Sequence, residues 1–75
     1  MPRLPLVGGR EVVKALIRLG FYKHHQTGSH VIMKHRIDPS RRTSVPQHPE
    51  LKLGTLLAIL KDTRVTREQF LDALR

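Results

Sequence analysis

The apolar residues of this chain follow a helical spacing near both ends and an alternating spacing in between. In the first part they recur every three to four positions up to Gly20, a typical helix stop, which predicts a helix over residues 9–19. The same spacing predicts a second helix over residues 54–62. Thr66 and Gln69 form the signature of a capping box, so a third helix is expected to begin there.

Three short segments between the first two helices have the composition of β-strands. Residues 21–27 and 30–37 are joined by a turn at Gly28, and residues 42–45 follow a turn over 38–40. Strands with such short connections pair as antiparallel neighbours. The order α-β-β-β-α-α therefore predicts an α+β fold, with a three-stranded antiparallel sheet that carries its helices on one face and leaves the other open to a large ligand. Double-stranded-RNA-binding domains have the same order with one helix fewer.

Residues 1–8 carry two prolines and no period, so we expect an N-terminal arm followed by a single domain over residues 9–75. A chain of 75 residues is too short to enclose a large active-site cavity. Any functional site must therefore be a groove or an exposed face. The expected core consists of apolar residues from the predicted helices and strands: Leu16, Phe21, Met33, Leu56, Leu60 and Phe70.

The charge of the chain points to a polyanionic partner. Fourteen Lys and Arg residues against six Asp and Glu give a net charge of +8. That excess favours nucleic acid, an acidic protein or an anionic membrane surface. Because 39% of the residues are hydrophobic, the chain can still build a core, which argues against a disordered basic tail.

Two absences narrow the chemistry and the location. There is no cysteine, which removes disulfides, thiolate metal ligands and cysteine nucleophiles together. No apolar run approaches the length of a membrane-spanning helix, and the N-terminus lacks the apolar stretch of a signal peptide. We therefore expect a cytoplasmic protein that has no membrane partner.

Cationic side chains gather in and beside the predicted sheet. This region holds only two acids, Asp38 and Glu50, so its charge is typical of a nucleic-acid-binding surface. A merely solvated cationic face is the alternative interpretation. Tyr22 is the one aromatic residue expected on the surface there, which favours recognition of RNA backbone or shape over stacking on single-stranded bases. The cations are Lys23, Lys34, Arg36, Arg41, Arg42 and Lys52.

The five histidines do not have the spacing of a familiar metal site. Neighbours within a strand point to opposite faces, so we expect that His24 and His25 do not share a metal. There is no H-E-x-x-H motif, and we expect neither a metal nor a cofactor. Histidines that are solvated or contact phosphate are the simpler interpretation.

His30 has a context of its own, because it follows Gly28 and Ser29 as the chain enters the second strand. A glycine there lets a polyanion backbone approach closely. Lys34 and Arg36 are expected on the same face, and cations beside an imidazole disfavour its protonated form. Such an imidazole can take a proton from a ribose 2′-OH or give one to the leaving 5′ oxygen. From these residues alone, a non-catalytic histidine that contacts phosphate is the simpler alternative.

Three short motifs follow one another along the chain: Gly28-Ser29-His30, then Val45-Pro46-Gln47-His48, then Leu53-Gly54-Thr55-Leu56. Leu19-Gly20-Phe21 precedes them, and Glu68-Gln69-Phe70-Leu71 follows them. The order and spacing of these motifs over residues 9–74 resemble the HicA family of small toxins, the messenger-RNA interferases of prokaryotic toxin–antitoxin pairs.

The resemblance implies a double-stranded-RNA-binding-like fold and a ribonuclease activity that does not need the ribosome. The catalytic histidine of this family lies in the Gly-Ser-His motif, which falls on His30. The partner implied is a HicB antitoxin that covers the active site. Because the chain is so basic, we expect this antitoxin to be acidic and to compete with RNA for the surface around His30.

In this interpretation the chain is a metal-independent endoribonuclease that acts on messenger RNA. Cleavage through the 2′-OH needs no metal and should leave a cyclic phosphate. Groups next to His30 would position the scissile phosphate, and nearby cations would stabilise the charge that builds on phosphorus. His48 is expected to order the loop before the second helix, and a second proton-transfer role is its alternative. The residues expected to bind RNA are Gly28, Ser29, Lys23, Lys34, Arg36 and Arg42.

The chain departs from the family pattern at two places. Gly8-Gly9 replaces a serine that is common at the start of the first helix, and Asp38-Pro39-Ser40 replaces a tight Asp-Gly hairpin turn. Neither departure touches the motif at His30. Two other functions stay open: a non-catalytic RNA-binding module on the same fold, and a scaffold that only binds an antitoxin.

Overall fold

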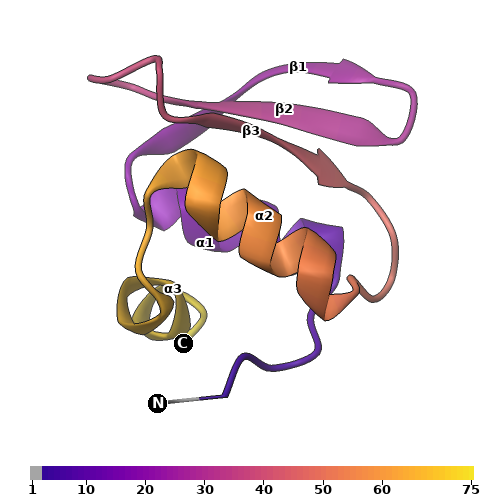
Figure 1. Ribbon diagram of the computed structural model, residues 1–75. Helices are drawn as coiled ribbons and strands as arrows, with labels where there is room; N and C mark the ends of the chain where they lie inside the picture. The colour runs from indigo at the N-terminus through magenta and orange to yellow at the C-terminus, as the bar shows by residue number, and fades with distance from the viewer. Residues whose placement is uncertain (1–2) are drawn as a thin grey trace.

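The computed structural model describes residues 3–75, which form one sheet and three helices. The elements follow the order α-β-β-β-α-α, which confirms the predicted α+β class (Figure 1). No helix in this part of the chain is long and apolar enough to cross a bilayer. The elements are α1 (Gly9–Arg18), β1 (Phe21–Thr27), β2 (His30–His35), β3 (Arg42–Pro46), α2 (Leu53–Thr63) and α3 (Arg67–Ala73).

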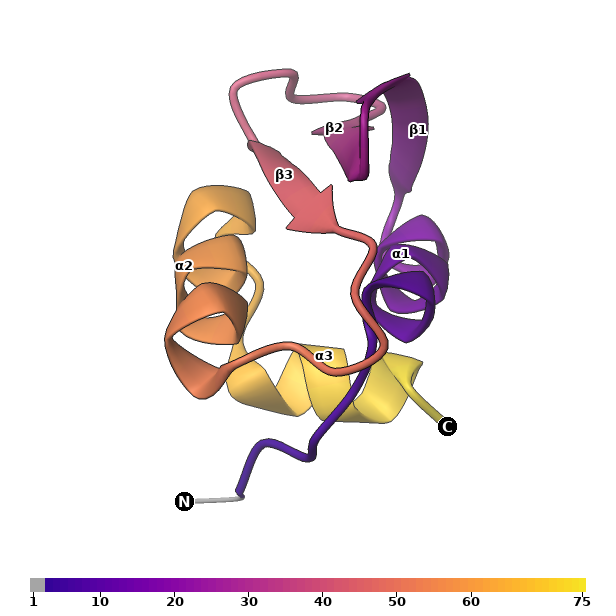
Figure 2. The same ribbon diagram turned by 90° about the vertical axis from the view of Figure 1, so that its right-hand side faces the viewer.

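The sheet has the strand order β1-β2-β3, and both strand pairs are antiparallel. One face of the sheet is covered, with α1 packed chiefly against β1 and α2 against β3. α3 lies beneath these two helices, on the side away from the sheet (Figures 1 and 2). The upper face of the sheet in Figure 1 carries no helix, so the predicted arrangement with helices on one face is confirmed.

Alternation along the strands decides which side chains reach the helices. Val31 and Met33 of β2 and Thr43 and Val45 of β3 are buried, whereas the residues between them are exposed or half-buried. Each apolar side chain that is fully buried contributes about 1.5–3 kcal/mol relative to its exposed state. The prediction of the core is confirmed, since all six expected residues are buried: Leu16, Phe21, Met33, Leu56, Leu60 and Phe70.

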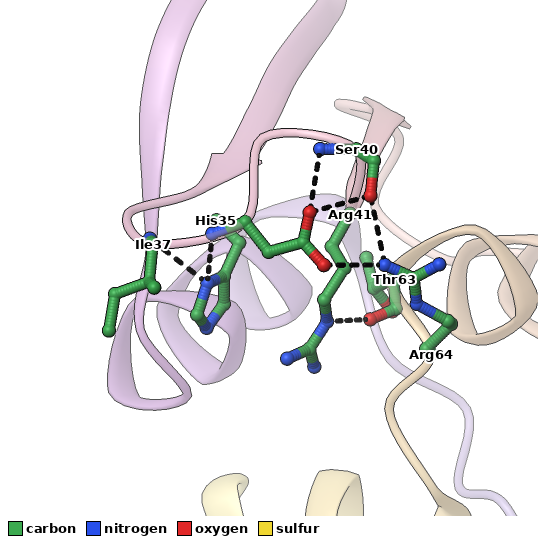
Figure 3. Close-up of polar contacts among 7 residues, drawn as sticks. His35, Ile37, Ser40, Arg41, Thr63 and Arg64 are labelled. Carbon is green, nitrogen blue, oxygen red and sulfur yellow. Dashed lines mark hydrogen bonds and ion pairs between the residues drawn. The ribbon is translucent and has the colours of Figure 1, made fainter.

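β2 ends at His35, two residues earlier than the sequence predicts. The reason is the imidazole of His35, whose Nδ1 accepts the backbone N–H groups of Ile37 and Asp38, both at 3.2 Å (Figure 3). These two bonds turn the chain out of the sheet. β3 extends one residue beyond the prediction, to Pro46, because an edge strand tolerates a residue without a backbone N–H.

Both ends of α3 are held by side-chain hydrogen bonds. The predicted capping box is confirmed: the Gln69 backbone N–H donates to Thr66 Oγ1 at 3.1 Å, and the Thr66 backbone N–H donates to Gln69 Oε1 at 2.9 Å. At the other end, the Arg18 guanidinium donates to the carbonyl oxygens of Ala73 at 2.6 Å and Arg75 at 2.9 Å. The last helix is thereby fixed to α1.

The start of α1 leaves no room for a side chain. A Cβ on Gly8, the N-cap residue, would lie 2.6 Å from the carbonyl oxygen of Pro49. A Cβ on Gly9 would overlap the carbonyl oxygen of Pro46. Glycine therefore replaces the serine that is common at this helix start, because the end of β3 and the loop after it lie too close for a side chain.

Part of the predicted N-terminal arm packs on the domain. Val7 is buried, and its carbonyl oxygen accepts the backbone N–H of Leu51 at 2.8 Å. Leu4 packs against the core. Met1 and Pro2, which also belong to the predicted arm, lie outside the described residues.

The loop between β2 and β3 is tied to the C-terminal end of α2. The Arg64 guanidinium contacts the Asp38 carboxylate at 2.7 Å and the Ser40 hydroxyl at 2.9 Å (Figure 3). Arg41 Nε donates to the carbonyl oxygen of Thr63 at 2.7 Å. These contacts fix the β2–β3 hairpin to the end of α2 and so hold the shape of the uncovered face.

Candidate nucleic-acid interface

The strand register defines the side chains on the uncovered face of the sheet. Residues directly opposite each other on antiparallel strands share a face. Three rows of such residues cross the sheet on the side away from the helices. We call this surface the open face. Its rows are Tyr22, Lys34 and Arg42; then His25, Ile32 and Ser44; then Thr27, His30 and Pro46.

His30 lies exposed at one corner of the open face, as the first residue of β2. The turn that precedes it requires a glycine, because Gly28 has a φ of +57°. A Cβ there would meet nothing within 4 Å, so the constraint is the backbone conformation and the space above Gly28 is free. The Ser29 carbonyl oxygen accepts the backbone N–H of Gln47 at 2.6 Å, which fixes the turn to the end of β3.

Gln47 is a residue whose role the sequence reasoning missed. Besides its bond to the turn before His30, its side-chain Nε2 donates to the Val45 carbonyl oxygen at 3.1 Å. Next to it, the His48 carbonyl oxygen accepts the backbone N–H of Gly9 at 3.0 Å, which joins this loop to α1. The motif that carries these residues thus supports the position of His30. The only sequence signal for this supporting role was that the Val45-Pro46-Gln47-His48 motif follows the Gly28-Ser29-His30 motif along the chain.

Three of the predicted RNA-binding cations gather at the other end of the open face. Lys34 and Arg42 lie opposite each other on β2 and β3. The guanidinium carbon of Arg36 lies 5.8 Å from the centre of the Tyr22 ring, a cation–π contact. The result is a cationic cluster around one aromatic ring, on the same face as His30.

Two other cations of the predicted cluster lie elsewhere. Lys23 is opposite Met33, which points to the helices, and it lines a hollow of about 170 Å³ together with Arg10 and Lys14 of α1. Arg41 is held at the end of α2 and lies 5.4 Å over the Phe21 ring. The structure therefore separates Lys23 from the open face, and its expected contact with RNA stays a prediction about a different surface.

The expectation that His24 and His25 point to opposite faces is wrong. The pairing of β1 with β2 shifts between Lys23 and His25, so His24 occupies a β-bulge. The bulge brings the two rings to 4.9 Å between centres, with 2.7 Å between the two Nδ1 atoms. One Nδ1 must donate and the other accept, so the pair holds one proton between these nitrogens.

The positive charge of Lys34 lowers the pKa of His24 below its ordinary value. Slight desolvation and the charges of His25 and Arg42 act in the same direction. His24 is therefore neutral near pH 7. The sequence predicted that cations lie beside the imidazole of His30. In the structure, the histidine next to Lys34 and Arg42 is His24. Among residues 3–75, no three His, Asp or Glu side chains gather as ligands for a metal ion.

The chain matches the model of a known protein family. The model of the HicA toxin of bacterial toxin–antitoxin systems matches residues 9–65 of the chain. The matched region runs from the start of α1 to the residue before the capping box of α3, and it includes the turn at Gly28 and His30. No curated protein matches the chain.

Proposed function

Since the chain belongs to the HicA family of toxins from bacterial toxin–antitoxin systems, we propose that it is an mRNA interferase, an endoribonuclease that cleaves messenger RNA. The family implies a toxin with a cognate antitoxin, and its toxins are generally ribonucleases. The observation that supports cleavage by this chain is the position of His30. Its imidazole is exposed at a corner of an uncovered sheet face that also carries a cationic cluster.

In the proposed reaction His30 accepts the proton of a ribose 2′-OH. The 2′ oxygen then attacks the adjacent phosphorus, the bond to the 5′ oxygen breaks, and a 2′,3′-cyclic phosphate forms. Lys34 and Arg36, at the other end of the open face, bind phosphates farther along the strand and so hold the RNA on the sheet. Gly28 leaves free space for the RNA backbone beside the imidazole, and Ser29 lies next to it to position the phosphate. Proton transfer by a positioned imidazole accelerates such a step by about 10²–10⁴-fold.

The partner in this proposal is an acidic HicB-like antitoxin that covers the open face. A surface of this charge attracts an acidic protein and RNA by the same long-range force. The two partners would then exclude each other, and the toxin would be inactive in the complex.

A non-catalytic RNA-binding module is the second candidate function. One observation favours it: within residues 3–75 the His30 ring has no hydrogen-bonding partner to orient it. Catalytic histidines are commonly oriented by a further group. In this case the same cationic face would bind RNA without cleaving it.

Induced expression in a bacterial host separates the two candidates. The native chain should arrest growth, and His30→Ala should grow as well as cells without the toxin while still binding RNA. His48→Ala is the matched control, because His48 is exposed but lies in the loop before α2, and it should stay toxic. If His30→Ala arrests growth as strongly as the native chain, catalysis by His30 is wrong and the binding module is favoured.

A further inference from the structure

The histidine pair of β1 has no role in the mechanism above, yet it lies on the same face as His30. His25 is opposite Ile32, and His30 is two residues from Ile32 along β2. His25 and His30 are therefore diagonal neighbours across the two strands. Such neighbours are separated by about 7–8 Å between their Cα atoms. A phosphate group bound between two imidazoles at this spacing can be contacted by both.

The surroundings of the pair indicate which of the two rings donates in the contact between them. The charged groups that face His24 are Lys34 on β2 and Arg42 on β3, and Tyr22 on β1 lies 6.2 Å away between ring centres. None of these is a carboxylate. Because the cations disfavour a charge on His24, we take His24 Nδ1 as the acceptor of the contact between the two rings and His25 Nδ1–H as its donor.

When His25 is protonated on both ring nitrogens, its Nδ1–H donates to His24 Nδ1 across the 2.7 Å contact. Its Nε2–H is then free to be donated. This is the arrangement of a general acid whose second nitrogen is held by an orienting group.

We propose that His25 is the second catalytic group of the RNA cleavage, the general acid that protonates the leaving 5′ oxygen, and that His24 is its positioning residue. The inference rests on the proposed ribonuclease function. The proton of the 2′-OH goes to His30, the bond from the 2′ oxygen to phosphorus forms, and the bond from phosphorus to the 5′ oxygen breaks. His25 Nε2 gives its proton to that oxygen. The products are a 2′,3′-cyclic phosphate and a 5′-hydroxyl, and exchange with water restores both rings.

A substrate with a sulfur atom in place of the bridging 5′ oxygen tests the role of His25. A thiolate is a far better leaving group than an alkoxide, so it departs without a proton donor. On the ordinary RNA oligonucleotide, His25→Ala should cleave about 10²–10⁴-fold more slowly than the native protein. On the sulfur substrate it should cleave within a few-fold of the native rate, whereas His30→Ala should be slow on both. His48→Ala, the matched control, should match the native protein on both.

The outcomes separate this inference from the function on which it rests. His25→Ala that cleaves ordinary RNA at the native rate overturns the assignment of His25 alone. Equal slowing on both substrates does the same, since it indicates a role in folding or binding. A native protein that cleaves no RNA overturns both proposals. Circular dichroism and RNA binding of each variant show that the fold is intact.

The positioning role of His24 has its own test in the pH–rate profile. The rate should fall at alkaline pH as the acid loses its proton. In His24→Ala the imidazolium of His25 loses its acceptor, so the alkaline limb should move to lower pH. In His24→Asn the amide oxygen can replace Nδ1 as acceptor, and the limb should return toward its native position. An alkaline limb that is the same in all three proteins overturns the role of His24.

Discussion

His35 is a structural histidine that supports the interface without belonging to it. Its Nδ1 accepts two backbone N–H groups of the β2–β3 loop, so its ring proton must lie on Nε2. The ring packs edge-on against Phe21, with 4.9 Å between centres. His35 therefore links the end of the central strand to the core and fixes where the loop leaves the sheet.

Replacing His35 should destabilise the fold. His35→Ala removes two hydrogen-bond acceptors and an aromatic contact, which should lower the free energy of unfolding by about 1–2 kcal/mol. Urea unfolding measures the change. His48→Ala removes an exposed ring and should change it by less than about 0.5 kcal/mol. Equal unfolding midpoints for the two variants would contradict the role of His35.

Asp38 should make the protein more sensitive to acid. The hydrogen bond from the Ser40 hydroxyl lowers the pKa of this carboxyl most. Desolvation, the next largest effect, opposes it, and the Ser40 amide, Arg64 and Arg41 lower the pKa further. Because the pKa is lower in the folded than in the unfolded chain, the carboxylate contributes stability above its ordinary pKa. That stability is lost as the pH falls through the folded value. Asp38→Asn should therefore lose less stability than the native protein between about pH 6 and pH 3 in urea unfolding. A native-like loss would contradict the prediction.

Arg64 joins the end of helix α2 to the β2–β3 loop, but its own backbone adopts an unfavourable conformation. It is the C-cap residue of α2 and has a φ of 57°, in the left-handed region. A residue other than glycine costs roughly 1–2 kcal/mol there. The contacts of its guanidinium with Asp38 and Ser40 offset part of that cost, although these groups are largely exposed.

Two substitutions of Arg64 separate the side-chain contacts from the backbone strain. Arg64→Ala and Arg64→Gly both remove the contacts, but only glycine relieves the strain. Arg64→Gly should therefore be more stable than Arg64→Ala by about 1 kcal/mol. Thermal or urea unfolding of the pair gives the difference. Equal stability would mean that the left-handed conformation is not retained in solution.

The elements could be predicted from the sequence because each has a local signal. The spacing of hydrophobic residues predicted the helices, and their alternation predicted strand β2. The capping box predicted where α3 begins. Features that depend on partners across the fold were not predictable. The bulge at His24 arises from the pairing of β1 with β2, and the early end of β2 arises from a side chain that bonds back to its own loop. The place of Lys23 on the helix side follows from that same register.

The whole molecule has two surfaces with different tasks. The helices cover one face of the sheet and hold the core, so the other face is free to contact a large partner (Figure 1). A ribonuclease that acts on a long polyanion needs an open cationic surface and positioned proton-transfer groups, and an enclosed pocket is unnecessary. A chain of 75 residues can supply both.

The dependence of RNA binding on salt should map the path of the RNA. In a His30→Ala background, which prevents cleavage, Lys34→Gln and Arg42→Gln should each reduce the slope of log K against log salt concentration by about 0.7–1. Lys61→Gln, an exposed lysine on α2, is the control and should leave the slope unchanged. Unchanged slopes for Lys34 and Arg42 would contradict the cationic cluster as the RNA-binding surface. A reduced slope for Lys23→Gln would show that the RNA also passes the β1 edge toward α1.

The most direct test of the central claim is RNA cleavage by the purified protein in the presence of a metal chelator. The native protein should cut messenger RNA and leave 2′,3′-cyclic phosphate and 5′-hydroxyl ends. His30→Ala should bind the RNA but cut it at least about 10²-fold more slowly, while His48→Ala cuts at the native rate. RNA that stays intact with the native protein, or is cut equally well by His30→Ala, would contradict the account.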